Sequence, residues 1–414
     1  MRNKFVVPGL AIFFALALFL SAWAAPAQAQ AGGPSARVGA SLVNVDGRIF
    51  LFGGSSTSIM GFAPGAKLAA PALRPLYAEM GDLWEFNNEN GNFTQIDISG
   101  ESPAPRYGHA AAAADGKMYI FGGKGAEDRL NDAWVFDPDT HTWKELQPRG
   151  KKLEIATGAA AIADGGAIYV LAKNGIFIYE ISDNFWAQVE KPPAERSGAS
   201  IAPIIGGNIF FFGGWDYGLQ KKGEETFIFD TATSSWKSIP CTGESLALEY
   251  ATVVSQGNTI WVIGGLGEGL RGDILQVKID ETLSRCTVEK VASNILDYGR
   301  TNASAVLLPG STESYTRILL FGGDMGGEIV GNPIVIELGE PAPSPTPTET
   351  PTQPPAPQSS PIPSETPRSP VGEKPLPPAE RKDPFAEMMK FACNPCGSAP
   401  ALLLLVMMLL AKRR

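Results

Sequence analysis

Histidine, cysteine and basic charge are scarce in this chain. Its 414 residues include 2 histidines and 4 cysteines, and 34 lysines and arginines stand against 43 aspartates and glutamates, which gives a net charge of −9. A surface that binds nucleic acid needs a basic patch, and no run of Lys and Arg interleaved with aromatic residues occurs in the body of the chain. This balance argues against nucleic acid as a partner.

Common catalytic motifs are also missing. Neither a G-x-S-x-G nucleophile elbow nor a Walker phosphate loop occurs anywhere in the sequence. Gly267–Gly272 matches the dinucleotide fingerprint, but residues 273–279 read as a strand, so no helix N-terminus follows to hold a pyrophosphate. Asp137–His141 begins like a calcium loop, yet Thr142 and Pro148 stand where an EF-hand needs Gly and Glu. An Asx-stabilised turn is the better interpretation, and we expect no cofactor and no metal.

The chain does contain a repeated apolar segment that ends in two glycines. Five copies read IFLFGG, MYIFGG, IFFFGG, IWVIGG and ILLFGG, and a sixth, AIYVLAK, has lost its glycines. Glycine permits positive φ and close backbone approach as the chain leaves an inner strand, so we interpret the pairs as structural. The pairs are Gly53 and Gly54, Gly122 and Gly123, Gly213 and Gly214, Gly264 and Gly265, and Gly322 and Gly323.

Each copy lies inside a larger unit that reads as four short strands. In the second unit Arg106 opens an Ala-rich strand, and Asp115-Gly116 makes a turn into MYIFGG. A variable loop then leads to residues 131–137, and a polar turn leads to Trp143. Apolar and aromatic runs bounded by Gly, Asp and Asn are strand signals, and Asp-Gly favours hairpin turns. The sequence predicts one antiparallel sheet per unit.

This unit resembles the kelch repeat. The likeness is carried by an opening Arg, the glycine pair, an Asp before the third strand and a Trp on the fourth. The arginines are Arg37, Arg106, Arg196 and Arg300; the aspartates are Asp82, Asp132 and Asp273; the tryptophans are Trp143, Trp186 and Trp236. The resemblance covers residues 37–338 and implies an all-β, six-bladed β-propeller. The blades are expected at about 37–96, 106–146, 155–189, 196–239, 250–291 and 300–338.

Three units depart from the pattern. The third lacks both the glycine pair and the opening Arg, so its loop must be built differently. The fifth has Leu275 where a third-strand aromatic residue is expected. The sixth stops after residues 332–338 without a fourth strand, and too little mature sequence precedes Arg37 to lend one. The sequence therefore leaves open how the ring is closed.

Long connections are expected at one end of the ring. In an antiparallel meander the loops from strand two to three, and from strand four to the next blade, share one end, and here they are long and varied, with an apolar stretch at 55–80. Such loops on a rigid scaffold usually carry binding function, so we predict a ligand-binding face there. Candidate contacts are Tyr77, Trp215, Asp216, Tyr217, Lys221, Lys222, Arg271, Asp297 and Tyr298. Trp215–Tyr217 is favoured, because aromatic residues beside charge are typical anchors.

Two functional classes stay open at this point. The favoured one is a propeller that binds a protein or glycan ligand through this face without catalysis. The alternative is an enzyme resembling the exported kelch sugar mutarotases and epimerases, with acid–base candidates Glu79, Asp216, Glu268 and Arg271. The copper site of kelch-type oxidases is not expected, because His109 and His141 lie apart in the repeat.

The ends of the chain predict export and anchoring. Residues 1–29 read as a secretory signal peptide with a cleavage site at Ala27-Gln-Ala29, the alternative being an uncleaved anchor. Residues 339–382 read as a disordered Pro-rich stalk. Residues 383–414 hold a Cys motif, a hydrophobic helix and a basic end that would remain cytoplasmic, with the helix entering the membrane. This layout resembles the C-terminal sorting signals of bacterial surface proteins, which implies a cell-surface location.

The four cysteines form two groups. Cys241 and Cys286 fall near the fourth strands of neighbouring units in a chain expected to be exported, so they form either a disulfide or two free thiols. Cys393 and Cys396 belong to the expected anchoring motif. Half of a zinc site is not expected there, because no second pair lies nearby.

Overall fold

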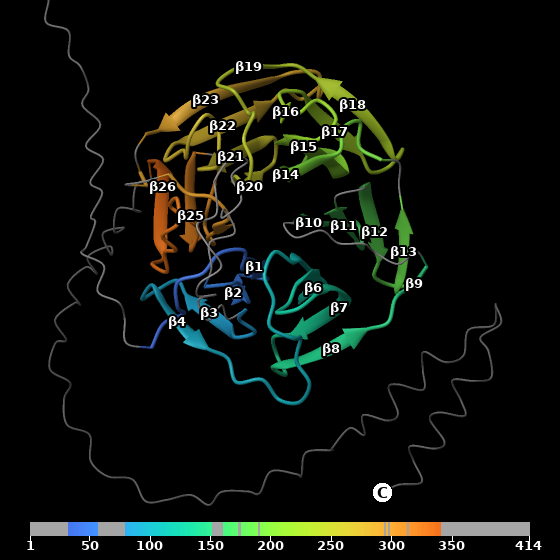
Figure 1. Cartoon of the computed structure of the whole chain (residues 1–414), viewed down its shortest axis with the longest axis vertical. Helices are drawn as coiled ribbons and strands as arrows, with labels where there is room; N and C mark the ends of the chain where they lie inside the picture. Colours follow the sequence, from blue (N-terminus) through green and yellow to red (C-terminus); the bar gives the residue numbers. More distant parts are fainter. Residues whose placement is uncertain are drawn as a thin grey trace, which may run out of the picture. The chain divides into compact units, whose positions relative to one another are not determined.

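The computed structural model describes residues 32–56, 79–150, 160–172, 175–188, 191–293, 295–296, 299–312 and 314–340. These residues form six antiparallel sheets around a central axis (Figure 1). The single helical element described is the short 3-10 turn η1 (Ile205–Gly207). The prediction of an all-β, six-bladed propeller is thus confirmed for this part. The predicted signal peptide, stalk and C-terminal helix lie outside the described residues.

Blades 1 to 3 come first in the chain. Blade 1 consists of β1 (Ser41–Val45), β2 (Arg48–Phe52), β3 (Leu83–Asn87) and β4 (Asn92–Gln95). Blade 2 consists of β5 (Ala110–Ala114), β6 (Lys117–Lys124), β7 (Arg129–Asp137) and β8 (Thr142–Leu146). Blade 3 consists of β10 (Ala160–Asp164), β11 (Ala167–Ala172), β12 (Gly175–Glu180) and β13 (Phe185–Gln188), with β9 (Arg149–Gly150) at its outer edge.

Blades 4 to 6 complete the ring. Blade 4 consists of β14 (Arg196–Ile204), β15 (Asn208–Asp216), β17 (Thr226–Asp230) and β18 (Ser235–Ile239), and β16 (Lys221–Lys222) pairs with β15. Blade 5 consists of β20 (Thr252–Gln256), β21 (Thr259–Ile263), β22 (Ile274–Ile279) and β23 (Cys286–Ala292), with β19 (Cys241–Gly243) at its edge. Blade 6 has three strands, β24 (Ser304–Leu307), β25 (Tyr315–Phe321) and β26 (Ile334–Gly339).

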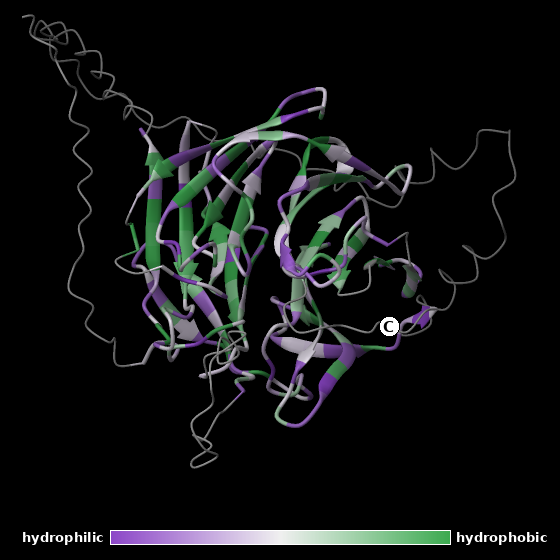
Figure 2. Ribbon diagram, turned by 45° about the horizontal axis from the view of Figure 1, so that its top comes forward, coloured by the Kyte–Doolittle hydropathy of each residue, from purple (hydrophilic) through white to green (hydrophobic). Residues whose placement is uncertain are grey.

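The core lies between neighbouring blades. Hydrophobic residues concentrate along the strands, whereas the hydrophilic ones lie mainly in the connecting loops (Figure 2). Phe210 and Phe212 of blade 4, for example, pack in one buried cluster with Ile260 and Val262 of blade 5. Because each sheet buries both faces against its neighbours, the repeated apolar runs are needed in every blade.

No helix within the described ranges is long and apolar enough to cross a lipid bilayer.

Short turns join the strands at one end of the ring. Asp46 and Asp115 have φ of 50° and are each followed by a glycine with positive φ, which is the backbone of a tight hairpin turn. The turn between β7 and β8 is stabilised by Asp137, whose Oδ1 accepts the N–H groups of Asp139 and Thr140 at 3.0 and 3.3 Å. The predicted Asx turn at this position is therefore confirmed.

The glycine pairs join each blade to the next. The N–H of Gly54 donates to the carbonyl of Arg106 at 2.8 Å, and that of Gly265 donates to the carbonyl of Arg300 at 2.7 Å. Both residues of each pair have positive φ. A Cβ on the first glycine, as at Gly53, would collide with the following blade, whereas a Cβ on the second, as at Gly54, would crowd the opening segment of its own blade. Blade 3 has no such pair, and its ladder between β11 and β12 extends to the pair of Ala172 and Gly175.

The opening arginines form buried ion pairs in blades 1 and 2. Arg37 makes two hydrogen bonds to Asp82, at 2.7 and 2.9 Å, and its side chain is fully buried. Asp82 also accepts the indole N–H of Trp84 at 2.6 Å. Burial alone would raise the pKa of Asp82, but the hydrogen bonds and charge of Arg37 outweigh it and hold that pKa below its usual range. Arg106 holds Asp132 in the same way, at 2.6 and 2.7 Å.

The ring closes by packing, and blade 6 has no fourth strand within the described residues. Phe93 on β4 packs against Phe321 on β25, with ring centroids 5.3 Å apart. The N–H of Arg37 donates to the carbonyl of Val330 at 3.2 Å, and the N–H of Gly323 donates back to the carbonyl of Arg37 at 3.0 Å. The described residues thus join the first and last blades without a strand lent from the other end.

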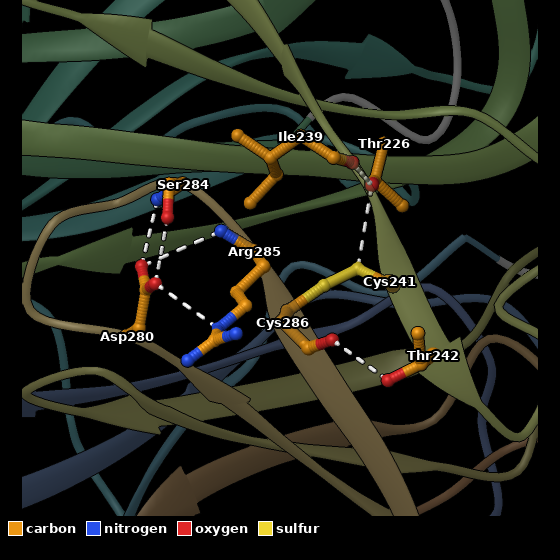
Figure 3. Close-up of a disulfide and its surroundings, with 8 residues drawn as sticks. All are labelled: Thr226, Ile239, Cys241, Thr242, Asp280, Ser284, Arg285 and Cys286. Carbon is orange, nitrogen blue, oxygen red and sulfur yellow. Dashed lines mark hydrogen bonds and ion pairs between the residues drawn. A yellow bond between two sulfur atoms is a disulfide. The ribbon is translucent and has the colours of Figure 1, made fainter.

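Two connections between blades contain a short strand that the sequence did not reveal. β9 pairs in parallel with β13, and β19 pairs in parallel with β23. Cys241 and Cys286 lie opposite each other in the second pair and form a disulfide, with Cα atoms 4.4 Å apart (Figure 3). The bond ties the connection after blade 4 to the outer strand of blade 5.

Candidate binding face and axial cavity

The six innermost strands enclose an axial cavity of about 610 Å³. Small residues dominate its wall, such as Ala111–Ala113 on β5 and Ala160 and Ala161 on β10. Its lining contains no Asp, Glu, Lys or Arg, and its titratable side chains are His109 and Tyr250. The described wall therefore supplies no carboxylate for acid–base chemistry.

A series of four backbone hydrogen bonds links five of the six blades at one mouth of the cavity. The amide of Gly108 donates to Gly39, that of Gly39 to Asn302, that of Asn302 to Tyr250, and that of Tyr250 to Gly198, at 2.8 to 3.2 Å. All five residues have positive φ. Glycine suits this backbone and asparagine tolerates it, whereas a tyrosine is strained in it. The strain marks Tyr250 as a residue of interest at the mouth.

Further along the cavity wall from this mouth, side-chain hydroxyl groups link the innermost strands of neighbouring blades. Ser200 donates to the carbonyl of Ala251 at 3.3 Å, Thr252 to that of Ala303 at 2.9 Å, and Ser304 to that of Ala40 at 2.6 Å. Each bond runs from one blade to the next. The wall's hydroxyls are therefore used to hold neighbouring strands together.

His109 continues this layer into blade 2. Its Nε2 lies 2.9 Å from Ser41 Oγ, its ring packs edge-on against Phe52, and its Nδ1 has no hydrogen-bond partner in the described structure. Burial, with the charge of Arg106 as a lesser cause, lowers the pKa of His109 to about 3. The imidazole is thus neutral near pH 7 and poorly suited to act as a general acid there.

The buried histidine should make folding stability depend on pH. Its pKa is about 3 in the folded state against 6.5 for an ordinary histidine, so between these values the unfolded chain binds a proton that the folded chain does not. Stability should therefore fall with acidification below about pH 6.5, by up to about 1.4 kcal/mol per pH unit.

The His109→Ala variant should lack this contribution because it has no imidazole. Alanine is suited to this position, since Ala40, Ala199, Ala251 and Ala303 occupy it in four other blades. Urea unfolding of both proteins at about pH 7 and about pH 5 measures the difference. Identical pH dependence in the two proteins would contradict the assignment.

The favoured cluster Trp215–Tyr217 lies on a hairpin at the same end as the mouth. β15 and β16 pair Trp215 with Lys222 and Asp216 with Lys221. Asp216 is buried, and its Oδ1 accepts the N–H groups of Gly218 and Leu219, both at 2.9 Å. The carboxylate predicted as a ligand contact therefore shapes the turn.

The tip of this hairpin is apolar and exposed. The side chains of Leu219 and Tyr217, at 58% and 53% exposure, are the most exposed large hydrophobic residues in the described part of the chain. Leu219 was missed by the sequence reasoning, which looked for aromatic and charged residues. The turn of this hairpin, in which Gln220 has φ of 54°, places Tyr217 and Leu219 two positions apart at its tip.

Two of the predicted cationic contacts are engaged within the fold. The ammonium of Lys222 donates to the carbonyls of Leu266 and Gly267 and lies 3.4 Å from Glu249. Lys222 thereby docks the blade 4 hairpin on the blade 5 loop. The guanidinium of Arg271 contacts Glu244 at 3.2 Å and Asp273 at 3.1 Å. Neither side chain is an open binding group.

The other predicted residues are divided. Lys221 is exposed and lies 3.8 Å from Glu224, and Trp215 is half-buried. Tyr77, Asp297 and Tyr298 lie outside the described residues, as do Cys393 and Cys396. None of Glu79, Asp216, Glu268 and Arg271 lines the axial cavity. No group of three or more potential metal ligands occurs in the ranges that the structure describes.

These observations define a blade 4–5 platform, made of the hairpin Trp215–Lys222, the mouth residue Tyr250 and the loop 266–271. Tyr250 lies against Gly198 and shares a hydrogen bond with Ser197, and burial raises its pKa. The platform is rigidly held from below and presents Tyr217 and Leu219 to solvent.

Comparison with known families agrees with this architecture. Residues 21–180 match the model described as "KLHDC2/KLHL20/DRC7 Kelch-repeats domain". The chain carries a kelch-repeat propeller. Three features agree with the kelch pattern: the Gly-Gly segments, the buried arginines and the ring of six sheets.

Curated relatives of this kelch propeller have different functions. The Rab9 effector protein with kelch motifs of Mus musculus is 26% identical over 187 residues, which cover 40% of this chain and 49% of that protein. The N-acetylneuraminate epimerase of Haemophilus influenzae is 27% identical over 172 residues, 39% of this chain and 41% of that protein. Kelch-like protein 40 of Mus musculus is 32% identical over 130 residues, 30% of this chain and 20% of that protein. Each match spans less than half of the relative.

Proposed function

We propose that this chain is a cell-surface kelch propeller that binds a protein or glycan ligand through the blade 4–5 platform, without catalysing a reaction. The observation that carries the proposal is the pair Tyr217 and Leu219, held exposed at the tip of a braced hairpin. Exposed aromatic and aliphatic side chains on a rigid support are the usual anchors of an interface.

Two observations support the surface location: the composition of the N-terminal and C-terminal segments, and the disulfide between Cys241 and Cys286. The signal-like residues 1–29 and the helix-like and basic residues 383–414 predict export and anchoring. The disulfide Cys241–Cys286 fits an oxidising compartment, where such bonds persist. In this proposal the stalk at 339–382 holds the propeller away from the membrane.

The binding proposal is tested by removing the tip of the hairpin. The double variant Tyr217→Ala, Leu219→Ala should lose ligand capture by tenfold or more, because two apolar anchors contribute about 1 kcal/mol or more each. The assay is a glycan array and a pulldown from cell envelopes with the purified chain. Unchanged capture would remove the platform as the site.

A matched variant controls for general loss of surface apolarity. Ile205→Ala changes a residue of 45% exposure in η1, at the opposite end of blade 4. This variant should capture ligand as well as the unaltered chain. An equal loss in both variants would show that the effect is not specific to the platform.

The second candidate is sugar epimerisation, which the similarity to N-acetylneuraminate epimerase favours. The uncharged lining of the described cavity argues against it. Incubation of the purified chain with N-acetylneuraminate, followed by NMR of the C3 methylene protons, which differ between the two anomers, distinguishes the two functions. Catalysed interconversion would replace the binding proposal with the enzymatic one.

A further inference from the structure

Blade 6 is the one described blade without a fourth strand. β26 pairs with β25 and ends the sheet, whereas every other blade has four or five strands. The amide of Leu308 donates to the carbonyl of Arg317, so the backbone N–H and C=O groups of Arg317 point toward β24. Glu337 lies opposite Arg317 in the β25–β26 ladder, and its backbone N–H and C=O groups therefore point away from β25. By the same alternation Val335 also directs its N–H and C=O outward. Among the described residues, β26 therefore presents an unpaired edge at the rim.

Apolar surface lies on both sides of the place where a fourth strand would run. A cavity of about 180 Å³ opens between blades 5 and 6, lined by Trp261, Gln276, Val291, Ser314, Thr316, Leu338 and Gly339. Val291 is 39% exposed beside it. Val335, on the other face of β26, is 42% exposed. Such exposed aliphatic residues next to an unpaired edge favour the addition of a strand.

The other blades show what fills the matching position. Four of them place an aromatic residue of the fourth strand opposite the third-strand residue that corresponds to Ile336. These pairs are Phe86 with Phe93, Phe136 with Trp143, Tyr179 with Trp186, and Phe229 with Trp236. In blade 5 the pair is Val277 with Val288. By analogy, a fourth strand on blade 6 would place an apolar and preferably aromatic side chain opposite Ile336.

We propose that an extended segment of a partner protein adds to β26 as the fourth strand of blade 6. The segment alternates apolar and polar residues and places an aromatic side chain opposite Ile336. Its backbone pairs with Val335 and Glu337, and its apolar side chains, on the same face as Ile336, cover Val291 and Leu338. This rim site is separate from the blade 4–5 platform and goes beyond the function proposed above.

The sequence after β26 makes a partner the favoured donor. Asp137 and Asp230 begin the turns to the fourth strands of blades 2 and 4, and each caps two backbone amides. Residues 337–343 contain no Asp or Asn, and no aromatic residue occurs between 341 and 384. The sequence directly after β26 therefore lacks both the turn signal and the aromatic residue that mark the fourth strands of other blades. A second copy has its fourth strands in use within its own blades.

The probe for this site is a peptide with the sequence of residues 140–147, the fourth strand of blade 2. It should bind the full chain saturably in calorimetry and slow hydrogen exchange at the amides of 335 and 337. Within the peptide, Trp143→Ala removes the aromatic anchor, and Lys144→Pro removes an N–H that faces the third strand. Each change should weaken binding by about tenfold.

Two variants of the protein separate backbone pairing from side-chain effects. Glu337→Pro removes the outward N–H but leaves the β25–β26 bonds, and it should weaken peptide binding by about tenfold. Glu337→Ala loses the contact with Arg317, keeps the N–H, and should bind as the unaltered chain does. Thermal melting of both variants checks that they fold.

Several results would overturn the rim site. These are absence of saturable peptide binding, peptide binding insensitive to Glu337→Pro, or amides 335 and 337 already protected in the full chain without peptide. A dimer that Glu337→Pro dissociates would assign the edge to a second copy instead. The variant Tyr217→Ala, Leu219→Ala should bind the peptide normally, so failure of the platform and failure of the rim site are distinguishable.

Discussion

Replacement of Arg106 by Met is expected to lower the free energy of unfolding by about 3–5 kcal/mol. The Arg106 side chain is fully buried, and its guanidinium makes two hydrogen bonds to Asp132 and one to the carbonyl of Gly122. Removal of the guanidinium leaves the Asp132 carboxylate, 23% exposed, without its cation. The loss includes the cost of an unpaired, partly buried charge, which exceeds the net contribution of the pair itself.

A surface pair provides the matched control for this prediction. Lys191 and Glu195 lie 3.1 Å apart, but both side chains are at least half exposed. Lys191→Met should change the free energy of unfolding by about 0.5 kcal/mol or less, since exposed pairs are screened by solvent. Urea unfolding of both variants measures the two values. Similar small losses in both would contradict a structural role for the opening arginine.

Replacement of Gly53 by Ala is expected to cost about 2–4 kcal/mol, the sum of backbone strain and collision. Gly53 has φ of +66°, and a Cβ there would stand 2.7 Å from the carbonyl oxygen of Arg106 and 3.1 Å from Cε1 of His109. The carbonyl belongs to the opening segment of the next blade, so it cannot move without separating blades 1 and 2. The neighbouring bond from Gly54 to Arg106 would also be weakened.

Gly91 allows the strain and the collision to be separated. It has φ of +73°, close to that of Gly53, but a Cβ there would meet nothing within 4 Å. Gly91→Ala should therefore cost only the strain of the left-handed backbone, about 1 kcal/mol. Thermal melting and urea unfolding of both variants give the difference. Equal costs would show that close approach between blades is not what the glycine pair provides.

The architecture could be predicted from the sequence because its signals are local and repeated. The Gly-Gly segments mark the end of the second strand in five units, the apolar run of the remaining unit matches them without the glycines, and Asp-Gly marks some of the short turns. Six sheets therefore follow from residues close together in the chain. The sequence also predicted a last blade without a fourth strand, because the apolar pattern stops at Leu338, and the described residues form three strands there. The mode of ring closure was not, since it depends on contacts such as Phe93 with Phe321.

The candidate site could be predicted less fully than the fold. The loop lengths suggested a binding face, which stays a prediction, and Lys222 and Arg271 were interpreted as open cations although the structure pairs both within the fold. Their partners, Glu249 and Glu244, lie more than twenty residues away in the chain, and only the packing of blade 4 against blade 5 brings them together. Tyr250 could have been found, because it stands where Gly39, Gly108 and Gly198 stand in other blades.

The short strands β9 and β19 show a further limit of sequence patterns. They contain two and three residues, too few for an alternating pattern, and they pair in parallel with an outer strand of the following blade. Only the position of Cys241 hinted at such a contact. A non-local pairing of this length has no sequence signature of its own.

The most direct test of ligand binding at the platform is site-specific cross-linking in the full chain. A photo-reactive residue replaces Leu219 at the hairpin tip in one protein and Ile205, at the other end of blade 4, in a second protein. The account predicts a cross-linked protein or glycan partner from position 219 and none from position 205. Cross-linking from position 205 alone, or equally from both, would contradict it.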